Sequence, residues 1–509
     1  MMLMIMEKAS VLLVFVVCVL QVGRMTSFVA ASPDFGVDVS IRGSVAVQRT
    51  AVRVEERFEE LTVHMDFMLV SSYEKLGLLQ NQVTYLVHNL TSIGTAFAMA
   101  LNSATTSNSD VVGTFEPLIY SVSRLQTIGV SDIVDIVGEI RGLVGQYLSL
   151  QLEDSFETLH DSVQKMFGAL IQLVSAIQTA SSPSNINWLF VNNLNRAVNV
   201  VRGNVLPLNY TIASTGENIR ESDAFLSRLS GRLELAETAV ENEERYFNSQ
   251  VDLVANATLL QADCSKQRVS GLAMAASPFV QTLCGFSKNL AECALQTAVQ
   301  SVVQMSTTEW DRVVGVVRRY FDNLREESAF VQEVVGRFSS IYNLGLLLAD
   351  VTISQRPYSL YCFHKFAHLI EQLVTRLTDG LVVCFNEEHT RLRSLQTGLV
   401  HMFATLVYDV EDLVEHLQFC TELEQRSECV TIVTMLYERL AAQLEEKLEA
   451  IEKFSIAETT ASNARLRLCV YHTQVTVFTV NIDQVRSDIV ECSEQGPLEH
   501  PYSMESRKM

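Results

Sequence analysis

The chain has 509 residues, of which 48% are hydrophobic, so it can bury a sizeable core and form roughly two to four domains. With 22 glycines and 8 prolines, it is neither collagenous nor rich in the turns that sheet folds require. Its net charge of −21 would repel a nucleic-acid backbone or an anionic membrane, so neither is an expected partner. This composition favours an all-α fold.

The first residues, 1–31, are predicted to be a signal peptide. Lys8 precedes the apolar run Val11–Leu20, and the small residues Val29–Ala31 follow, which is the order of regions in a secretory signal. The distance from Leu20 to Ala31 is long for signal peptidase, so an uncleaved anchor is the alternative. No later segment reaches the ~18 uninterrupted apolar residues of a membrane span. We therefore expect a secreted, extracellular chain without a membrane span after signal removal.

Two apolar stripes follow, each with apolar residues every three or four positions. The first runs from Leu61 through Met68 to Phe97, and the second runs from Phe156 to Ile177. The polar cluster Ser103–Asp110 is typical of a loop, and Ser181-Ser182-Pro183 is typical of a helix end. The two stripes are therefore expected to form an antiparallel helical hairpin.

The rest of the chain is also predicted to be helical, with less regular stripes between the first hairpin and the C-terminal region. Three Asn-X-Thr sequons, at Asn89, Asn209 and Asn256, are candidates for N-glycosylation, although a chain of this length contains a few by chance. The predicted organisation is a signal peptide (1–31), an N-terminal helical hairpin region (32–182), a middle helical region (183–357), a cysteine-rich helical domain (358–492) and a flexible tail (493–509).

Nine cysteines remain after the signal peptide, and an oxidising compartment favours their pairing. Cys384 lies 36 residues before Cys420, and Cys469 lies 40 residues after Cys429, so the spacing is nearly a mirror image. Two long antiparallel helices joined near Thr421–Glu428 would bring such cysteines to matched heights. The spacing thus predicts nested disulfides: Cys362 with Cys492, Cys384 with Cys469, and Cys420 with Cys429.

Pairing within one arm is disfavoured, because two cysteines 22 residues apart on a straight helix are about 33 Å apart. The arms differ by four or five residues, about one helical turn, and we expect a break or bulge at Thr459–Asn463 to absorb the difference. The alternation of β-branched residues in Val475–Val480 leaves a strand as the alternative for that segment.

Cys264, Cys284 and Cys293 form an odd set. Three arrangements remain open for the odd cysteine: a bond between two chains that gives a covalent dimer, a buried free thiol, or a bond to the later cysteines.

Tyr361-Cys362-Phe363, Cys384, the close pair Cys420 and Cys429, Cys469 and Cys492 together resemble the TsetseEP domain of secreted insect proteins. The resemblance covers roughly residues 358–492. It implies an extracellular insect protein with a disulfide-stapled helical domain and no established catalytic activity. That family is named after a protein with a Glu-Pro repeat tail, whereas this chain has only Glu116-Pro117, so properties of the tail do not carry over.

No motif for enzymatic chemistry is found: the glycine-rich phosphate loops, G-x-S-x-G, C-x-x-C and H-E-x-x-H are all absent from the sequence. His364 and His368 share a helix face, but a solvated pair is favoured over a metal site. Glutamate pairs such as Glu445-Glu446 are expected on solvated faces, and Trp188 and Trp310 are expected in the core. We therefore predict no enzyme, no cofactor and no metal.

The sequence as a whole predicts an elongated all-α protein, built as a helical bundle or long helical hairpins, with a C-terminal antiparallel hairpin stapled by disulfides. The expected function is that of a secreted structural or interaction protein, whose partner is an unknown extracellular protein or a second copy. A mean hydropathy of +0.18 keeps open an alternative, an extracellular carrier of lipid or another hydrophobic ligand.

Overall fold

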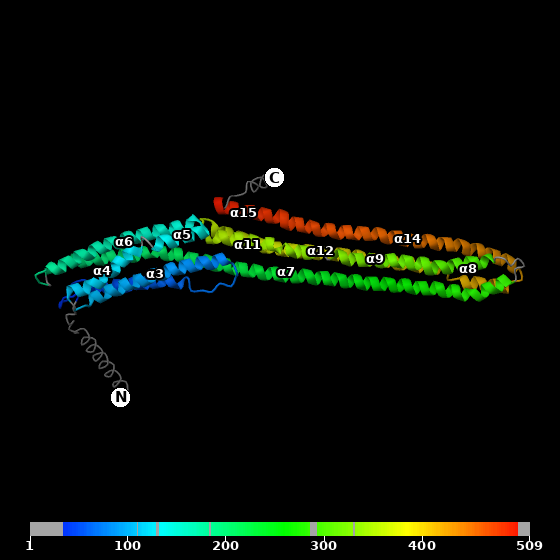
Figure 1. Cartoon of the computed structure of the whole chain (residues 1–509), viewed down its shortest axis with the longest axis horizontal. Helices are drawn as coiled ribbons and strands as arrows, with labels where there is room; N and C mark the ends of the chain where they lie inside the picture. The colour runs from blue at the N-terminus through cyan, green and yellow to red at the C-terminus, as the bar shows by residue number, and fades with distance from the viewer. Residues whose placement is uncertain are drawn as a thin grey trace, which may run out of the picture. The chain divides into compact units, whose positions relative to one another are not determined.

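A computed structural model describes residues 34–108, 110–128, 132–182, 185–285, 293–328 and 331–496. The predicted signal peptide and residues 497–509 of the predicted tail lie outside this part. The described residues form helices and no strand; one isolated bridge joins Asp34 and Val37. The all-α prediction is confirmed (Figure 1). The chain divides into two units: Met1–Ala224 with Ala349–Phe363 and Ser493–Met509, and Phe225–Leu348 with His364–Cys492.

The first unit is a group of packed helices with an apolar core. α3 packs on α2, α4 and α5, and α6 packs on α4 and α5. The hydroxyl of Thr50 on α2 donates a 2.8 Å hydrogen bond to the Asn195 side chain on α7. The helices are α2 (Ser44–Val63), α3 (Glu74–Thr105), α4 (Val111–Ile128), α5 (Asp132–Val144), α6 (Gln146–Thr179) and the beginning of α7 (Trp188–Gly285), as far as Ala224.

The predicted hairpin of two long stripes is wrong in two respects. The first stripe is split between α2 and α3 by a connection in which Met68 is 92% exposed. The carboxylate of Asp223 holds this connection, since it accepts 2.8 Å hydrogen bonds from the backbone N–H groups of Val70 and Ser71. In addition, α4 and α5 intervene between the two stripes along the chain. The apolar residues keep their helical spacing across the connection between α2 and α3. A periodic pattern of apolar residues does not show whether the backbone makes helical hydrogen bonds.

Gly94 allows α2 and α3 to approach closely, since a Cβ added there would overlap the ring of Phe58. We expect Gly94→Ala to lower the free energy of unfolding by about 1–3 kcal/mol through overpacking. Gly168→Ala is the matched control, because no atom lies within 4 Å of its added Cβ and alanine favours a helix by about 1 kcal/mol. Thermal unfolding of both variants checks this, and a Gly94→Ala protein as stable as wild type would contradict it.

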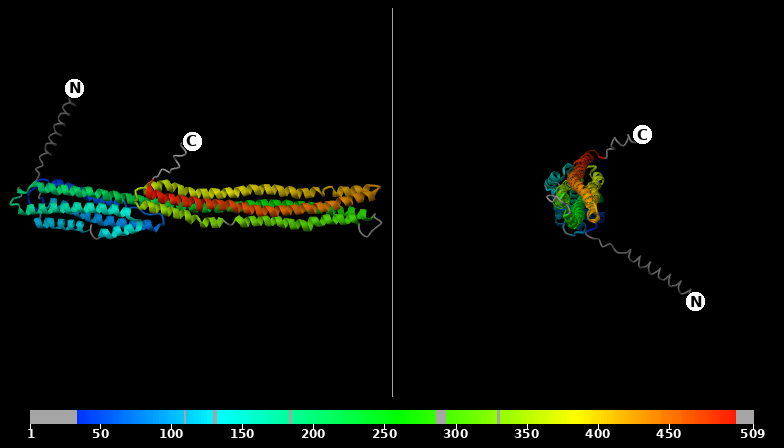
Figure 2. Two further views of the ribbon diagram at one scale, coloured as in Figure 1. Left: turned by 90° about the horizontal axis from the view of Figure 1, so that it is seen from above. Right: turned by 90° about the vertical axis from the view of Figure 1, so that its right-hand side faces the viewer.

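The second unit consists of four helical columns that lie side by side (Figures 1 and 2). Its helices are the rest of α7, α8 (Ala294–Gln304), the π-helix η2 (Met305–Glu309), α9 (Trp310–Ser328), α10 (Val331–Gly336), α11 (Phe338–Ile353, to Leu348), α12 (Ser359–Tyr408, from His364), α13 (Leu413–Glu422), α14 (Arg426–Gln474), the π-helix η3 (Val475–Asn481) and α15 (Ile482–Gln495, to Cys492).

Contacts between columns establish that neighbours in sequence run antiparallel. On α7 and α9, Asp252 pairs with Arg325 and Lys266 pairs with Asp311. On the C-terminal columns, Glu388 pairs with Arg465, while Asp409 pairs with Lys447. The 49 residues of α14 alone span about 75 Å. The second unit is therefore an elongated, up-down-up-down four-helix bundle whose last two columns form the predicted C-terminal hairpin.

The predicted break at Thr459–Asn463 is wrong, because α14 is continuous there and buries Ser462. The interruptions lie elsewhere. Around Asp409–Asp412, backbone bonds such as Val410 N–H to Val407 C=O have the spacing of a 3₁₀ turn, which rises faster per residue than an α-helix. The strand alternative for Val475–Val480 is also wrong: this β-branched run forms the π-helix η3.

By length and composition alone, one described stretch, Glu333–Ile353, could cross a membrane; its mean hydropathy is 1.2. In the fold, 44% of its most apolar part is buried, and a core helix of a soluble protein can have the same length and composition.

Candidate functional site

Disulfides hold the C-terminal hairpin together. Cys384 on α12 bonds Cys469 on α14 with a Cα–Cα distance of 5.7 Å, and Cys420 bonds Cys429 at 5.5 Å. Both were predicted from the mirror-image spacing and both are confirmed. Cys362 and Cys492 are also in disulfide form.

The odd set of three cysteines resolves into one pair and one free thiol. Cys284 bonds Cys293, while Cys264 is free and exposed. Of the arrangements left open by the sequence, a buried free thiol and a bond to the later cysteines are therefore wrong.

A buried carboxylate, missed by the sequence analysis, lies between α12 and α14. The Glu388 side chain is 2% exposed and accepts hydrogen bonds from Arg465 Nε at 3.2 Å and Nη2 at 3.0 Å, and from Arg391 Nη1 at 3.2 Å. A charge is tolerated at such a depth only when it is paired and hydrogen-bonded. One signal was available in the sequence: Glu388 stands in the apolar seam, four residues after Cys384 and four before Leu392.

Tyr320 on α9 closes this cluster from a third column, with its hydroxyl 3.1 Å from Ser462 Oγ. Burial raises the pKa of Tyr320 from 10.0 to about 12, although the hydrogen bond with Ser462 opposes the shift. Tyr437 on α14 is similar: burial, followed by the charge of Asp412, raises its pKa. Both phenols are therefore held neutral as structural groups.

These shifts predict a loss of stability at alkaline pH. Since the folded pKa of Tyr320 exceeds the ordinary value, the folded state keeps a proton that the unfolded chain loses between pH 10 and 12. Its contribution is complete below pH 10 and falls by about 1.4 kcal/mol for each pH unit between pH 10 and about 12. Urea unfolding of wild type and Tyr320→Phe at pH 9 and pH 11 measures the difference, and equal losses in the two proteins would contradict it.

Two further titrating groups have shifted pKa values. Burial, then the charge of Arg393, lowers the pKa of His389, whose ring lies edge-on to Tyr246 at 6.4 Å. Burial, then the charge of Glu241, raises the pKa of Glu244. A desolvated histidine and carboxyl can act in proton transfer, but neither is among the residues that line the polar groove near Gln474 or the apolar pocket near Phe419.

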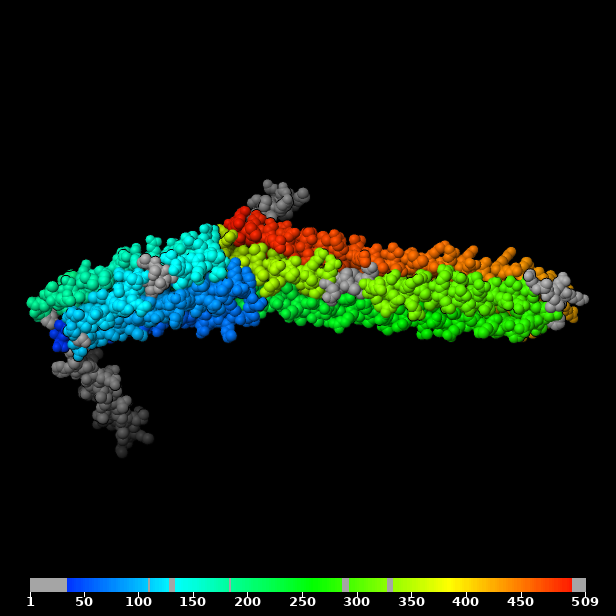
Figure 3. Space-filling view, in the orientation of Figure 1, coloured from blue at the N-terminus to red at the C-terminus, as the bar shows by residue number. Residues whose placement is uncertain are grey.

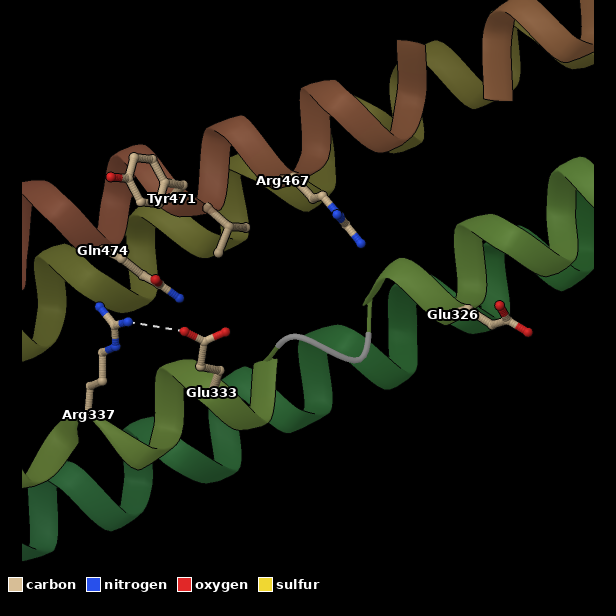
Figure 4. Close-up of a pocket in the computed structure, with 7 residues that line it drawn as sticks. Glu326, Glu333, Arg337, Arg467, Tyr471 and Gln474 are labelled. Carbon is tan, nitrogen blue, oxygen red and sulfur yellow. Dashed lines mark hydrogen bonds and ion pairs between the residues drawn. The ribbon is translucent and has the colours of Figure 1, made fainter. Parts of the chain in front are cut away.

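A polar groove of about 470 Å³ lies between the end of α9, the beginning of α10 and α14. Figure 4 shows Arg337 and Glu333 paired at its mouth, at 3.0 Å, with Gln474 above them and Arg467 reaching in from α14. Carboxylates and guanidinium groups alternate along it, so its charge is balanced. The described lining residues can bind a polar group through two carboxylates, two guanidinium groups, the Tyr471 phenol and the Gln474 amide.

A second pocket, the hairpin-end pocket, is more apolar and holds about 650 Å³. Phe419 of α13 is 60% exposed and Ile432 of α14 is 57% exposed, and the Cys420–Cys429 disulfide joins the two helices beside them. Exposed large apolar side chains of this kind suit contact with a partner or an apolar ligand. Its lining residues are His416, Phe419, Leu423, Glu424, Gln425, Glu428, Cys429, Ile432 and Val433.

The other residues singled out in the sequence do not converge. His364 and His368 are exposed, and His368 Nε2 lies 2.7 Å from Gln372 Nε2. Among the described residues, no group of three or more histidine, cysteine or acidic side chains could hold a metal. Trp310 is buried against Phe403, as predicted. Trp188 was expected in the core but is 47% exposed, with the guanidinium of Arg42 over its ring.

The three sequons differ in exposure. Asn256 is exposed on α7, whereas Asn89 and Asn209 are half-buried, and Asn209 Oδ1 is buried without a hydrogen-bond partner. The folded chain thus has most room for a glycan at Asn256. No protein-family model, curated protein or solved structure matches this chain.

Proposed function

We propose that the protein is a secreted, non-enzymatic structural or interaction protein. The disulfides are the observation that carries this proposal: of the nine cysteines in the described residues, eight are in disulfide form. Disulfides persist in oxidising compartments and are rare in the cytosol, where thiols are kept reduced. Multiple disulfides are thus compatible with an extracellular protein, and the apolar run Val11–Leu20 supports export.

The fold supports a role in binding another protein rather than in catalysis. The second unit is a long bundle whose polar groove has balanced charge, and whose hairpin-end pocket exposes Phe419 and Ile432. We propose that an extracellular protein is the partner. The TsetseEP-like spacing of Cys362–Cys492 supports an insect gut lining or body fluid as the setting.

Secretion is tested by expressing the chain with its own N-terminus in insect cells. We expect it in the medium, beginning near residue 32, with the eight cysteines of the internal disulfides unreactive towards a maleimide before reduction. Treatment with a glycosidase should remove a glycan that Asn256→Gln lacks. A cytosolic product whose cysteines all react with maleimide would overturn the proposal.

Carriage of a hydrophobic ligand is the alternative, favoured by the apolar hairpin-end pocket. Lipid extraction of the purified secreted protein, followed by mass spectrometry, separates the two functions, because a carrier retains lipid in stoichiometric amount. We expect none. Stoichiometric lipid that is lost in Phe419→Asp but kept in Tyr408→Asp, an exposed control on α12, would replace the structural proposal by the carrier.

A further inference from the structure

The outer face of α7 in the second unit carries large apolar side chains that the bundle leaves uncovered. Tyr246, Leu253, Leu260 and Met274 are 50%, 62%, 66% and 67% exposed. The first three are spaced by seven residues, and Met274 follows after two further sevens, with the exposed Gln267 between. Figure 3 shows α7, in green, along one edge of the second unit with its outer surface uncovered in this view.

From Leu253 onward smaller side chains fill the second position of each repeat, whereas the first repeat has Gln250 there. Ala257, Cys264 and Gly271 each stand four residues after a member of the row, and a Cβ added to Gly271 would meet no atom within 4 Å. Apolar residues that alternate at spacings of three and four make the seam of a coiled coil. The opposite face of α7, which includes Phe247, Val251 and Val254, is already buried in the bundle. We call the outer row the α7 seam: Tyr246, Leu253, Ala257, Leu260, Cys264, Gln267, Gly271 and Met274.

Cys264 indicates which occupant the α7 seam suits. It is exposed and free, in a chain whose other described cysteines are all in disulfides. In a parallel pair of identical helices every seam residue faces its own counterpart, whereas antiparallel pairing sets the two kinds of seam position against each other, so that Cys264 would not face Cys264. Helices in contact have axes roughly 8–10 Å apart, which places facing Cα atoms roughly 4–6 Å apart, within the range of a disulfide.

Charges beside the seam fit the same arrangement. Asp263 and Arg268 flank Cys264 on opposite sides and are five residues apart, the offset at which flanking residues of parallel coiled-coil helices form ion pairs. Both are exposed, and Arg268 also contacts Glu411 of its own chain. In a chain of net charge −21, such local opposite charges are needed for two copies to approach.

We propose that the α7 seam is the interface of a parallel homodimer closed by a disulfide between the two Cys264 residues. The bond forms when the two thiols lose two protons and two electrons to a small-molecule disulfide, which is reduced to two thiols. The proposal deepens the proposed interaction function by naming a second copy as partner. The homodimer depends on the proposed function in one respect, because secretion would supply the oxidising compartment. The experiment supplies the oxidant directly to purified protein instead.

The experiment uses the full secreted chain with N-glycans removed, because Asn256 lies one residue from the seam. Oxidised glutathione is added, and the covalent dimer is followed on non-reducing gels. We expect wild type to dimerise, Cys264→Ser to give no covalent dimer, and Leu260→Glu to slow the reaction roughly tenfold or more. Leu468→Glu on α14, 68% exposed in wild type, is the matched control and should react like wild type.

Two further measurements keep the proposal falsifiable. Sedimentation of Cys264→Ser protein, which keeps its internal disulfides, should show reversible dimers that the added change Leu260→Glu weakens roughly tenfold and the added change Leu468→Glu does not. The double variant Cys264→Ser/Leu253→Cys should again form a covalent dimer, since parallel helices set residue 253 against itself. Equal rates for wild type and Leu260→Glu would overturn the interface. No covalent dimer in the double variant would overturn the parallel arrangement, and a secreted but monomeric protein would leave the proposed function intact.

Discussion

Replacing both Cys384 and Cys469 by serine is expected to lower the free energy of unfolding of the second unit by about 4–5 kcal/mol. The two cysteines are separated by 85 residues, so their bond removes much conformational entropy from the unfolded chain. This is an upper figure, because strain in the folded state reduces it. Urea unfolding, followed by circular dichroism with the other disulfides intact, measures the loss.

The Cys420–Cys429 disulfide is the internal control for this prediction. Its cysteines are separated by only 9 residues, so the same argument gives about 2.5–3 kcal/mol for replacing both. We therefore expect the first double variant to be destabilised by about 2 kcal/mol more than the second. A larger loss of stability in the second double variant than in the first would show that loop-closure entropy does not determine how much each disulfide stabilises the hairpin.

Glu388→Ala is expected to destabilise the second unit by about 1.5–3 kcal/mol, since it removes a buried carboxylate that accepts hydrogen bonds from two arginines. Arg465 would keep only its 3.3 Å contact with Glu458 and the 3.0 Å hydrogen bond that it donates to Ser462. The loss exceeds that of a surface pair because Glu388 is 2% exposed, so its hydrogen bonds to Arg465 and Arg391 form away from water and its removal leaves a gap between the helices.

Glu387→Ala is the matched control for this change. Glu387 also contacts Arg391, at 3.4 Å, but its side chain is 57% exposed, and an exposed pair contributes at most about 0.5–1 kcal/mol. Chemical unfolding of both variants at neutral pH is the measurement. Similar losses in the two would mean that the Glu388 cluster is solvated rather than buried.

The C-terminal hairpin could be predicted because cysteine spacing reports distance along a helix directly. At a constant rise per residue, Cys384 and Cys469 come to matched heights only if the chain folds back near Cys420 and Cys429. The position of the irregularities could not be predicted this way. The Ser/Thr-rich segment Thr459–Asn463 suggested a break in the helix. In the fold, the Ser462 hydroxyl makes hydrogen bonds with Tyr320 and Arg465, so packing keeps that segment helical.

The candidate site was less accessible to sequence reasoning. Glu388 and Glu387 are identical neighbours in the sequence, yet one is buried and the other exposed, because a helix turns about 100° between them and only one faces α14. The sequence analysis did not single out Phe419 and Ile432, because apolar spacing does not reveal where a bundle ends. At the end of the last hairpin, no helix of the described residues covers them, and they are 60% and 57% exposed.

The amino-acid sequence alone therefore determined the helical class, the antiparallel C-terminal hairpin and two of its disulfides, since these follow from local periodicity and the fixed rise of a helix. Only the tertiary structure decided which charges are buried, where the helices deviate from α-geometry, and which thiol and apolar faces stay exposed. Those properties depend on which columns pack together, and side chains far apart in the chain, such as Tyr320, Glu388 and Arg465, become neighbours only after packing.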